Sequence, residues 1–81
     1  MAKPSPKHAG NKALVDLGSV IRQARSKAGI SQEALAADAE VDRSYMGGIE
    51  RGEHNLTVMN LKRIAEALNL KPSTLLKDAD L

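Results

Sequence analysis

The chain has no cysteine, almost no aromatic residue and no long apolar run, and each absence excludes a class of function. Without cysteine there is no disulfide framework, no thiolate metal site and no cysteine nucleophile. Tyr45 is the only residue among Phe, Trp and Tyr, which argues against base stacking on single-stranded nucleic acid. No apolar stretch approaches the roughly 18 residues of a membrane span, and the polar N-terminus has no apolar signal segment. We therefore expect no membrane segment and a cytoplasmic location.

Catalytic patterns are also missing from the sequence. His8 and His54 lie far apart, and there is no Ser-His-Asp set, no HExxH motif and no phosphate-binding glycine loop. No group of residues has the spacing of metal ligands. We therefore expect a protein that is not an enzyme and that binds neither a cofactor nor a metal.

Positive charge is concentrated at the N-terminus. The chain has 12 basic and 10 acidic residues, for a net charge of +2. Residues 1–12 carry three lysines and no acid, which leaves nine basic and ten acidic residues, a net charge of −1, for residues 13–81. Residues 1–12 are predicted to be a flexible basic leader. It is either a solvated tail or an arm that adds weak, salt-sensitive attraction to phosphates.

Apolar residues recur at intervals of three and four from residue 13 onward, and no segment alternates with period two. Ser31, Asp42 and Thr57 are typical residues for the start of a helix, whereas Gly29 and Gly52 are typical of helix ends. The pattern predicts an all-α fold with one domain over residues 13–81. Five helices are expected: from about 13 to 28, from 32 to 38, from 43 to 50, from Thr57 to about 68, and from Pro72 onward.

Two of these helices, 32–38 and 43–50, are short and lie close together in the sequence. Neither would be stable alone, because isolated helices of fewer than about 12 residues are marginal in water. The pair is reasonable if the first helix braces the second at a steep angle and leaves the outer face of the second free. That arrangement is the helix-turn-helix, whose second helix enters the major groove of DNA.

The stretch from Leu17 to Leu76 resembles the lambda-repressor-like family, the Cro/cI-type (XRE) helix-turn-helix domains. The run SQEALAADAEVDRSYMGGIERGEHNLTVMNLKRIAEALNLKPSTLL carries the resemblance. Within it, Asp42-Arg43-Ser44-Tyr45 and the later Ile49-Glu50-Arg51-Gly52 are similar to the controller proteins of restriction–modification systems. The resemblance implies a compact five-helix DNA-binding domain and a small dimeric regulator, either a controller protein or a phage-type repressor.

Two residues depart from the family pattern. Glu40 stands in the turn between the motif helices, where the family usually has glycine because the backbone often has a positive φ there. Either Glu40 accepts a left-handed conformation or the turn differs. Lys71 stands at the cap of the last helix, where Ser or Asp would be better, so this helix end is expected to fray.

Four residues of the expected recognition helix are candidates for contact with base edges: Arg43, Ser44, Gly47 and Gly48. An arginine at this position can bond bidentately to guanine, which contributes roughly 1–3 kcal/mol of discrimination. Its alternative role is a surface charge or a phosphate contact. The two glycines are unusual inside a helix. Either they allow close approach to the groove, or they are tolerated because other residues hold the helix in place.

By resemblance, a second group of residues is expected to contact phosphates: Gln32, Tyr45, Arg51, His54, Asn55 and Thr57. Gln32 begins the bracing helix, where free backbone N–H groups favour a phosphate. Asn55 and Thr57 are the better candidates in the loop, and His54 is expected to be solvated. The resemblance also implies a structural ion pair between Arg25 and Glu50, so that Glu50 would not read a base.

Apolar residues near the C-terminus are expected to be exposed: Leu70, Leu75, Leu76 and Leu81. We interpret Leu70, Leu75 and Leu76 as a homodimer interface, since a two-fold dimer would place two recognition helices about 34 Å apart. The prediction is a homodimeric transcription regulator that binds a two-fold symmetric operator on double-stranded DNA, with RNA polymerase as a further candidate partner. The alternative is an antitoxin or adaptor that binds a protein partner through its C-terminal helices.

Overall fold

Five helices account for most of the chain that the computed structural model describes, residues 11–81. They are α1 (Lys12–Ala28), α2 (Gln32–Asp38), α3 (Arg43–Glu50), α4 (Val58–Ala67) and α5 (Pro72–Asp78). No strand forms among these described residues. The all-α prediction and its five helices are therefore confirmed.

Side chains of four residues cap the starts of α1 to α4. Ser31, Asp42 and Thr57 accept hydrogen bonds from backbone N–H groups in the first turns of α2, α3 and α4, as expected. Asn11 does the same for α1, which therefore begins at Lys12. The predicted leader was too long by these two residues, and the rest of it, residues 1–10, lies outside the described residues.

The turn between α2 and α3 keeps its helix-turn-helix geometry without a glycine. Glu40 has a φ of 59°, and the N–H of Val41 donates to the carbonyl of Ala36 at 2.9 Å. These are the left-handed residue and the bond of a Schellman motif. Of the two alternatives, Glu40 takes the left-handed conformation. At the other departure, Lys71 makes no side-chain cap bond and Pro72 opens α5.

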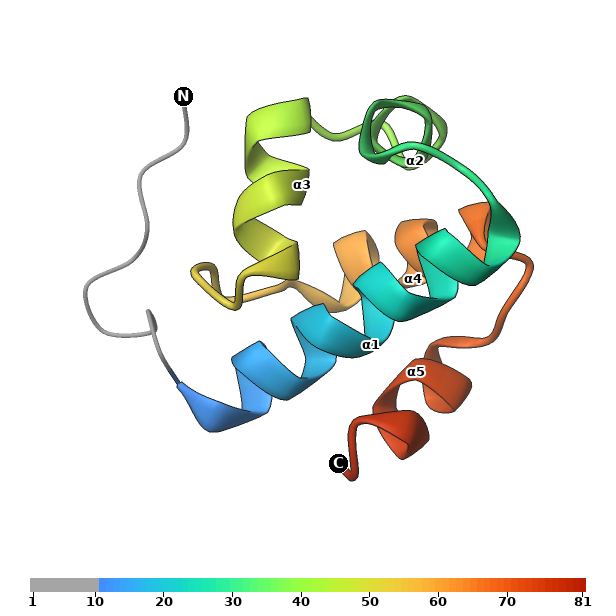
Figure 1. Ribbon diagram of the computed structural model, residues 1–81. Helices are drawn as coiled ribbons and strands as arrows, with labels where there is room; N and C mark the ends of the chain where they lie inside the picture. Colours follow the sequence, from blue (N-terminus) through green and yellow to red (C-terminus); the bar gives the residue numbers. More distant parts are fainter. Residues whose placement is uncertain (1–10) are drawn as a thin grey trace.

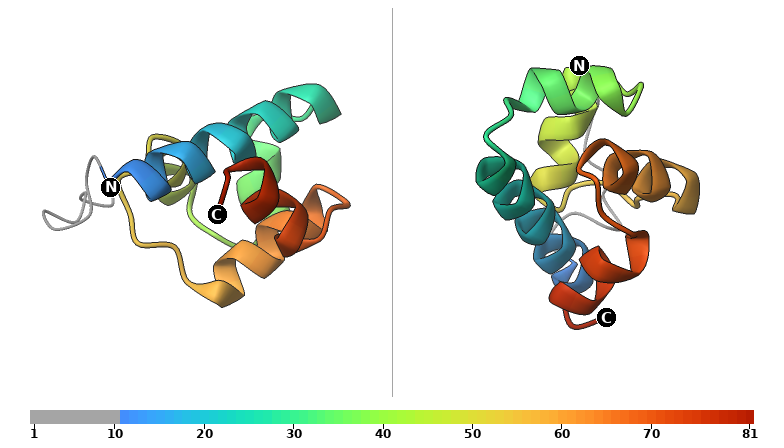
Figure 2. Two further views of the ribbon diagram at one scale, coloured as in Figure 1. Left: turned by 90° about the horizontal axis from the view of Figure 1, so that it is seen from below. Right: turned by 90° about the vertical axis from the view of Figure 1, so that its right-hand side faces the viewer.

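The helices surround one small core to which every helix contributes. The five largest fully buried side chains come one from each helix: Ile21, Leu35, Met46, Ile64 and Leu75. Figure 1 shows α2 and α3 on one side of α1 and α5 on the other, and the right-hand view of Figure 2 places α2 and α5 at opposite ends of the molecule. The exposed faces of α2 and α3 are therefore well separated from the C-terminal helix.

Helices α1 and α3 approach so closely that glycine is required at their crossing. A Cβ atom on Gly18 would collide with the carbonyl oxygen of Ile49 and stand 2.7 Å from that of Glu50. Because both obstacles are backbone atoms at the end of α3, they cannot swing aside. The contact fixes α3 on α1, and with it the direction of the recognition helix.

None of the described helices combines the length and the apolar character that crossing a membrane requires.

Candidate nucleic-acid interface

The first turn of α3 presents the predicted base-reading side chains to solvent. Asp42 caps this turn by accepting hydrogen bonds from the N–H groups of Ser44 and Tyr45 at 2.9 and 3.3 Å. The Arg43 side chain is 66% exposed, and Ser44 is partly exposed. α2 packs against α3. Arg43 and Ser44 therefore stand where side chains could reach the base edges of a groove.

Arg43 has an acidic neighbour on α2. Its Nε lies 3.6 Å from Oε1 of Glu33, and the Glu33 side chain is 75% exposed. An ion pair this exposed contributes little to stability. The guanidinium remains free to move toward a base.

The structure gives the two glycines of α3 a packing role. Both are buried. A Cβ on Gly48 would collide with the ring of His54, and a Cβ on Gly47 would stand 3.1 Å from Nη1 of Arg51. Gly48 faces the loop that follows α3, so contact of this residue with a base edge is not supported. Each glycine leaves room for a side chain lying against the helix, a role that neither of the two sequence-based interpretations included.

His54 is not the solvated histidine that the sequence indicated. It is only 8% exposed, and its ring stacks on Tyr45 with a centroid distance of 4.7 Å and an interplanar angle of 30°. The buried Nε2 has no hydrogen-bond partner. With Nε2 covered in this way, the structure gives no support to the phosphate contact predicted for His54, which stays a prediction. Nothing in the local sequence marks His54 as buried, because the missing side chain of Gly48 is what creates its place.

The predicted ion pair between α1 and the end of α3 is present. Nε and Nη2 of Arg25 donate to Oε2 and Oε1 of Glu50 at 2.7 and 3.1 Å. Nη1 of Arg25 donates to the carbonyl of Ile30 at 3.1 Å. The Glu50 side chain is 3% exposed, and its hydrogen bonds raise the pKa of Arg25 above the ordinary value. Glu50 is thus a structural residue, as expected.

Gln32 joins this buried pair to the surface of α2. Its Nε2 donates to Oε1 of Glu50 at 3.1 Å. One of its amide hydrogens is therefore engaged inside the protein, while the residue remains partly exposed at the start of α2. The side chain that was predicted to contact a phosphate is held in place by the ion pair behind it.

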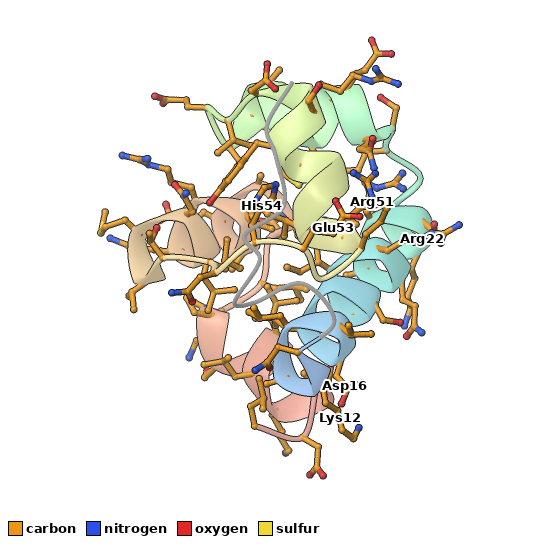
Figure 3. The ribbon with its side chains drawn as sticks, turned by 90° about the vertical axis from the view of Figure 1, so that its left-hand side faces the viewer. Lys12, Asp16, Arg22, Arg51, Glu53 and His54 are labelled. Carbon is orange, nitrogen blue, oxygen red and sulfur yellow. The ribbon has the colours of Figure 1, made fainter. Side chains whose placement is uncertain are left out.

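Arg51 is paired with an acidic residue that the sequence analysis did not single out. Nε and Nη2 of Arg51 donate to Oε2 and Oε1 of Glu53 at 2.8 and 3.0 Å. Figure 3 shows the two side chains together beside α3. The hydrogen bonds from Arg51 lower the pKa of Glu53, and those to Glu53 raise the pKa of Arg51. The i, i+2 spacing was visible in the sequence, but helical periodicity does not predict that these neighbours meet.

Asn55 and Thr57 lie exposed in the loop before α4, as predicted. The hydroxyl oxygen of Thr57 accepts the N–H of Asn60 at 3.0 Å. Because this bond uses only the acceptor, the hydroxyl hydrogen remains available to a phosphate. The two residues adjoin the start of α4, where backbone N–H groups favour an anion.

The predicted apolar surface near the C-terminus is only partly present. Leu75 is fully buried in the core, so the expectation that it is exposed, and with it its direct role in an interface, is wrong. Leu70 and Leu76 are partly buried, and Leu81 is 58% exposed. Two apolar side chains of α4 are more exposed than Leu70, Leu75 or Leu76: Val58 is 80% exposed and Met59 is 53% exposed. The periodicity of α5 did not distinguish Leu75 from Leu76, because only packing against α1 and α4 does so.

The structure brings some of the residues predicted to contact DNA together in three groups. Gln32, Gly47 and Arg51 meet where α2 begins beside α3, since both Nη1 of Arg51 and Oε1 of Gln32 lie within 3.4 Å of the point where a Cβ on Gly47 would stand. Tyr45 and His54 form the second group, and the first turn of α3 forms the third.

Within residues 11–81, no three His, Asp or Glu side chains come together in a way that could hold a metal ion.

Comparisons with known proteins cover this whole region. The family profile described as Helix-turn-helix matches residues 21–75, which include α2, α3 and α4. Control protein C.BamHI from Bacillus amyloliquefaciens is 42% identical over 60 residues, covering 73% of this chain and 74% of that protein. Control protein C.MunI from a Mycoplasma species is 32% identical over 71 residues, covering 86% of this chain and 96% of that protein. The crystal structure of the restriction-modification controller protein C.AhdI from Aeromonas hydrophila matches with a TM-score of 0.75 at 44% identity, over 76% of this chain and 94% of that one.

Proposed function

This chain belongs to the helix-turn-helix family of DNA-binding transcription regulators, with restriction–modification controller proteins among its relatives, and we propose that it acts as a homodimer on a two-fold symmetric operator. The observation that carries this proposal is the exposed first turn of α3, which is capped by Asp42 and backed by α2. In this mechanism the turn enters the major groove and occupancy of the operator regulates transcription. Depending on the position of the operator, the bound dimer blocks RNA polymerase or contacts it. The proposed place of action is the cytoplasm, where the operator DNA of a bacterial cell lies.

Base reading is assigned to Arg43 and Ser44. The guanidinium of Arg43 is exposed, and its weak pairing with Glu33 does not prevent bidentate bonding to O6 and N7 of a guanine. Ser44 lies beside it, and its hydroxyl can both donate and accept. Gly47 and Gly48 are left out of this set because both are buried.

Phosphate contacts are assigned to residues on either side of the recognition helix. Gln32 lies at the start of α2, Tyr45 lies on α3, and Arg51 lies at the end of α3. Asn55 and Thr57 lie before α4. Such contacts fix the position of the protein on the duplex without reading its sequence. His54 would contribute to DNA binding indirectly, because its ring stacks on the ring of Tyr45 and holds it in position.

The dimer is assigned to the surface around Leu70 and Leu76. A groove of about 660 Å³ lies between α1 and α5 and is lined by Ala24 and Leu70. Leu76 lies outside this lining, on the same helix as Thr74 and Asp78, which do line it. Burying these partly exposed leucines against a second copy would remove apolar surface from water. In sedimentation experiments, Leu76→Lys should weaken self-association, whereas Val58→Lys, which changes an exposed residue of α4, should not. A dimer unaffected by Leu76→Lys would rule out this surface.

The function is tested by selecting bound duplexes from a randomised double-stranded DNA library. The wild type should enrich a two-fold symmetric motif, and Arg43→Ala should relax one base position in each half-site. Losing a bidentate contact should cost roughly 1–3 kcal/mol at that position. Lys77→Ala removes one positive charge from α5 and should leave the motif unchanged. Enrichment without any motif would contradict sequence-specific binding and would favour the alternative, a protein partner in the groove between α1 and α5.

A further inference from the structure

The turn that ends α3 brings two oppositely charged side chains together. Gly52 has a φ of 75°, and the N–H of Glu53 donates to the carbonyl of Gly48 at 2.9 Å. These are the features of a Schellman motif, in which the left-handed residue reverses the chain at the helix end. The backbone of Glu53 is thereby fixed against α3, and its carboxylate meets the guanidinium of Arg51.

The resulting pair has the geometry with which an arginine binds a phosphate. Nε and Nη2 of Arg51 donate to the two carboxylate oxygens at 2.8 and 3.0 Å. Carboxylates and phosphates are both bound through two such parallel N–H···O bonds. The Nε and Nη2 edge of Arg51 can therefore hold Glu53 or a phosphate, but not both in this manner.

Arg51 also lies where a phosphate contact is expected. Its Nη1 is next to Gly47, beside Gln32 at the start of α2. The Arg51 side chain is 60% exposed, and the Glu53 side chain is 27% exposed. An exposed pair of this kind is weak enough for an external anion to displace the carboxylate.

We propose that Glu53 competes with DNA phosphates for Arg51, and so lowers the affinity of this chain for DNA. The proposal rests on the proposed function, and it assigns to Glu53 a role in setting affinity without reading any base. The carboxylate cancels the charge of Arg51 in the free protein, and it repels an approaching phosphate. Because phosphate contacts carry no sequence information, the effect should be the same on every duplex.

The experiment compares the wild type with Glu53→Gln, which keeps the shape of the side chain and removes its charge. Binding to a duplex of arbitrary sequence is measured by fluorescence anisotropy over a range of KCl concentrations. The control is Glu66→Gln, which changes the net charge equally and also removes an ion pair, since Glu66 lies 3.9 Å from Lys62 on α4. Arg51→Gln and the Arg51→Gln/Glu53→Gln double variant complete the set.

Glu53→Gln should bind DNA more tightly than Glu66→Gln at low salt, by a factor of up to about five, the upper end of what an exposed ion pair contributes. The dependence of log affinity on log salt concentration should also become steeper by about 0.9, which corresponds to one more phosphate contact. In the Arg51→Gln background, Glu53→Gln should not increase the affinity beyond the Glu66→Gln control.

Two results would overturn the inference while leaving DNA binding intact. One is equal affinity of Glu53→Gln and Glu66→Gln, which would mean that only net charge matters. The other is the same gain with and without Arg51, which would mean that Glu53 acts directly on the DNA. If neither the wild type nor any variant binds this duplex or any duplex of the randomised library, the proposed function itself is refuted, and this outcome is distinct from the other two.

Discussion

Removing the Glu50 carboxylate should destabilise the domain more than any surface substitution. Glu50→Ala leaves two groups without their acceptor: the guanidinium of Arg25, which keeps only the carbonyl of Ile30, and the amide of Gln32. The Arg25 side chain is 16% exposed, so its charge would remain largely buried without a counterion. Breaking a buried pair in this way costs about 3–5 kcal/mol.

That loss is large for a chain of this length. A domain of 81 residues has a free energy of unfolding on the order of 4–12 kcal/mol. At about 4–8 °C per kcal/mol, the melting temperature should fall by at least about 12 °C. Circular dichroism at about 222 nm follows the transition directly, because the folded chain is helical. Glu66→Ala, which removes an exposed pair on α4, should cost less than about 1 kcal/mol and is the control.

The double variant Arg25→Met/Glu50→Leu distinguishes two sources of the destabilisation. One is the cost of leaving the charge of Arg25 buried without a counterion, and the other is the loss of the attraction between the two side chains. If the cost of Glu50→Ala comes from a charge left unpaired, replacing both partners by apolar residues should be much less destabilising than the two single changes added together. Two results would refute this reasoning. They are a Glu50→Ala cost below about 1 kcal/mol, and single-variant costs that simply add in the double variant.

Three further predictions follow from the backbone geometry. Gly18→Ala should abolish folding or lower the melting temperature by more than about 10 °C, because its Cβ meets backbone oxygens at the end of α3; near-wild-type thermal melting would show that α1 and α3 can separate at little cost. Glu40→Gly should stabilise the domain by up to about 1 kcal/mol in urea unfolding, since Glu40 is exposed and left-handed. A lower urea midpoint would mean that the freedom gained by the unfolded chain outweighs the strain. Gly48→Ala should displace the ring of His54 and change the fluorescence of Tyr45, the only tyrosine, in the same way as His54→Ala does. A spectrum identical to that of the wild type would show that the ring stays in place.

Most of the fold could be predicted from the sequence because helix signals are local. The caps at Ser31, Asp42 and Thr57 lie directly before the helices that they start, and each makes the expected hydrogen bond. Asn11 was missed as a cap because it lies in a polar segment with lysines and prolines, which resembles a tail. The structural role of Glu50 came from the family resemblance, since nothing in its neighbourhood shows that Arg25 is its partner.

The candidate site was harder to predict because the exposure of its residues depends on which other segments pack over them. Gly48 and His54 were assigned to contacts with DNA, yet they pack on each other. Leu75 and Leu76 are adjacent and chemically identical, but Leu75 is fully buried in the core, whereas Leu76 packs against the core and stays partly exposed. In each case the sequence specifies which residue is present, and the neighbouring helix or loop decides whether it faces solvent.

The sequence by itself determined the five helices, the helix-turn-helix and the position of Arg43 at the start of α3, because helical periodicity and capping depend on residues only a few positions apart. The tertiary structure alone decided the close crossing at Gly18, the place of His54 beneath Tyr45 and the pairing of Arg51 with Glu53. The crossing at Gly18 brings together α1 and the end of α3, which are far apart in the chain. The place of His54 depends on α3 and on the loop that follows its turn. The third requires the left-handed conformation of Gly52, which reverses the chain only once α3 is in place to accept the hydrogen bonds of the turn.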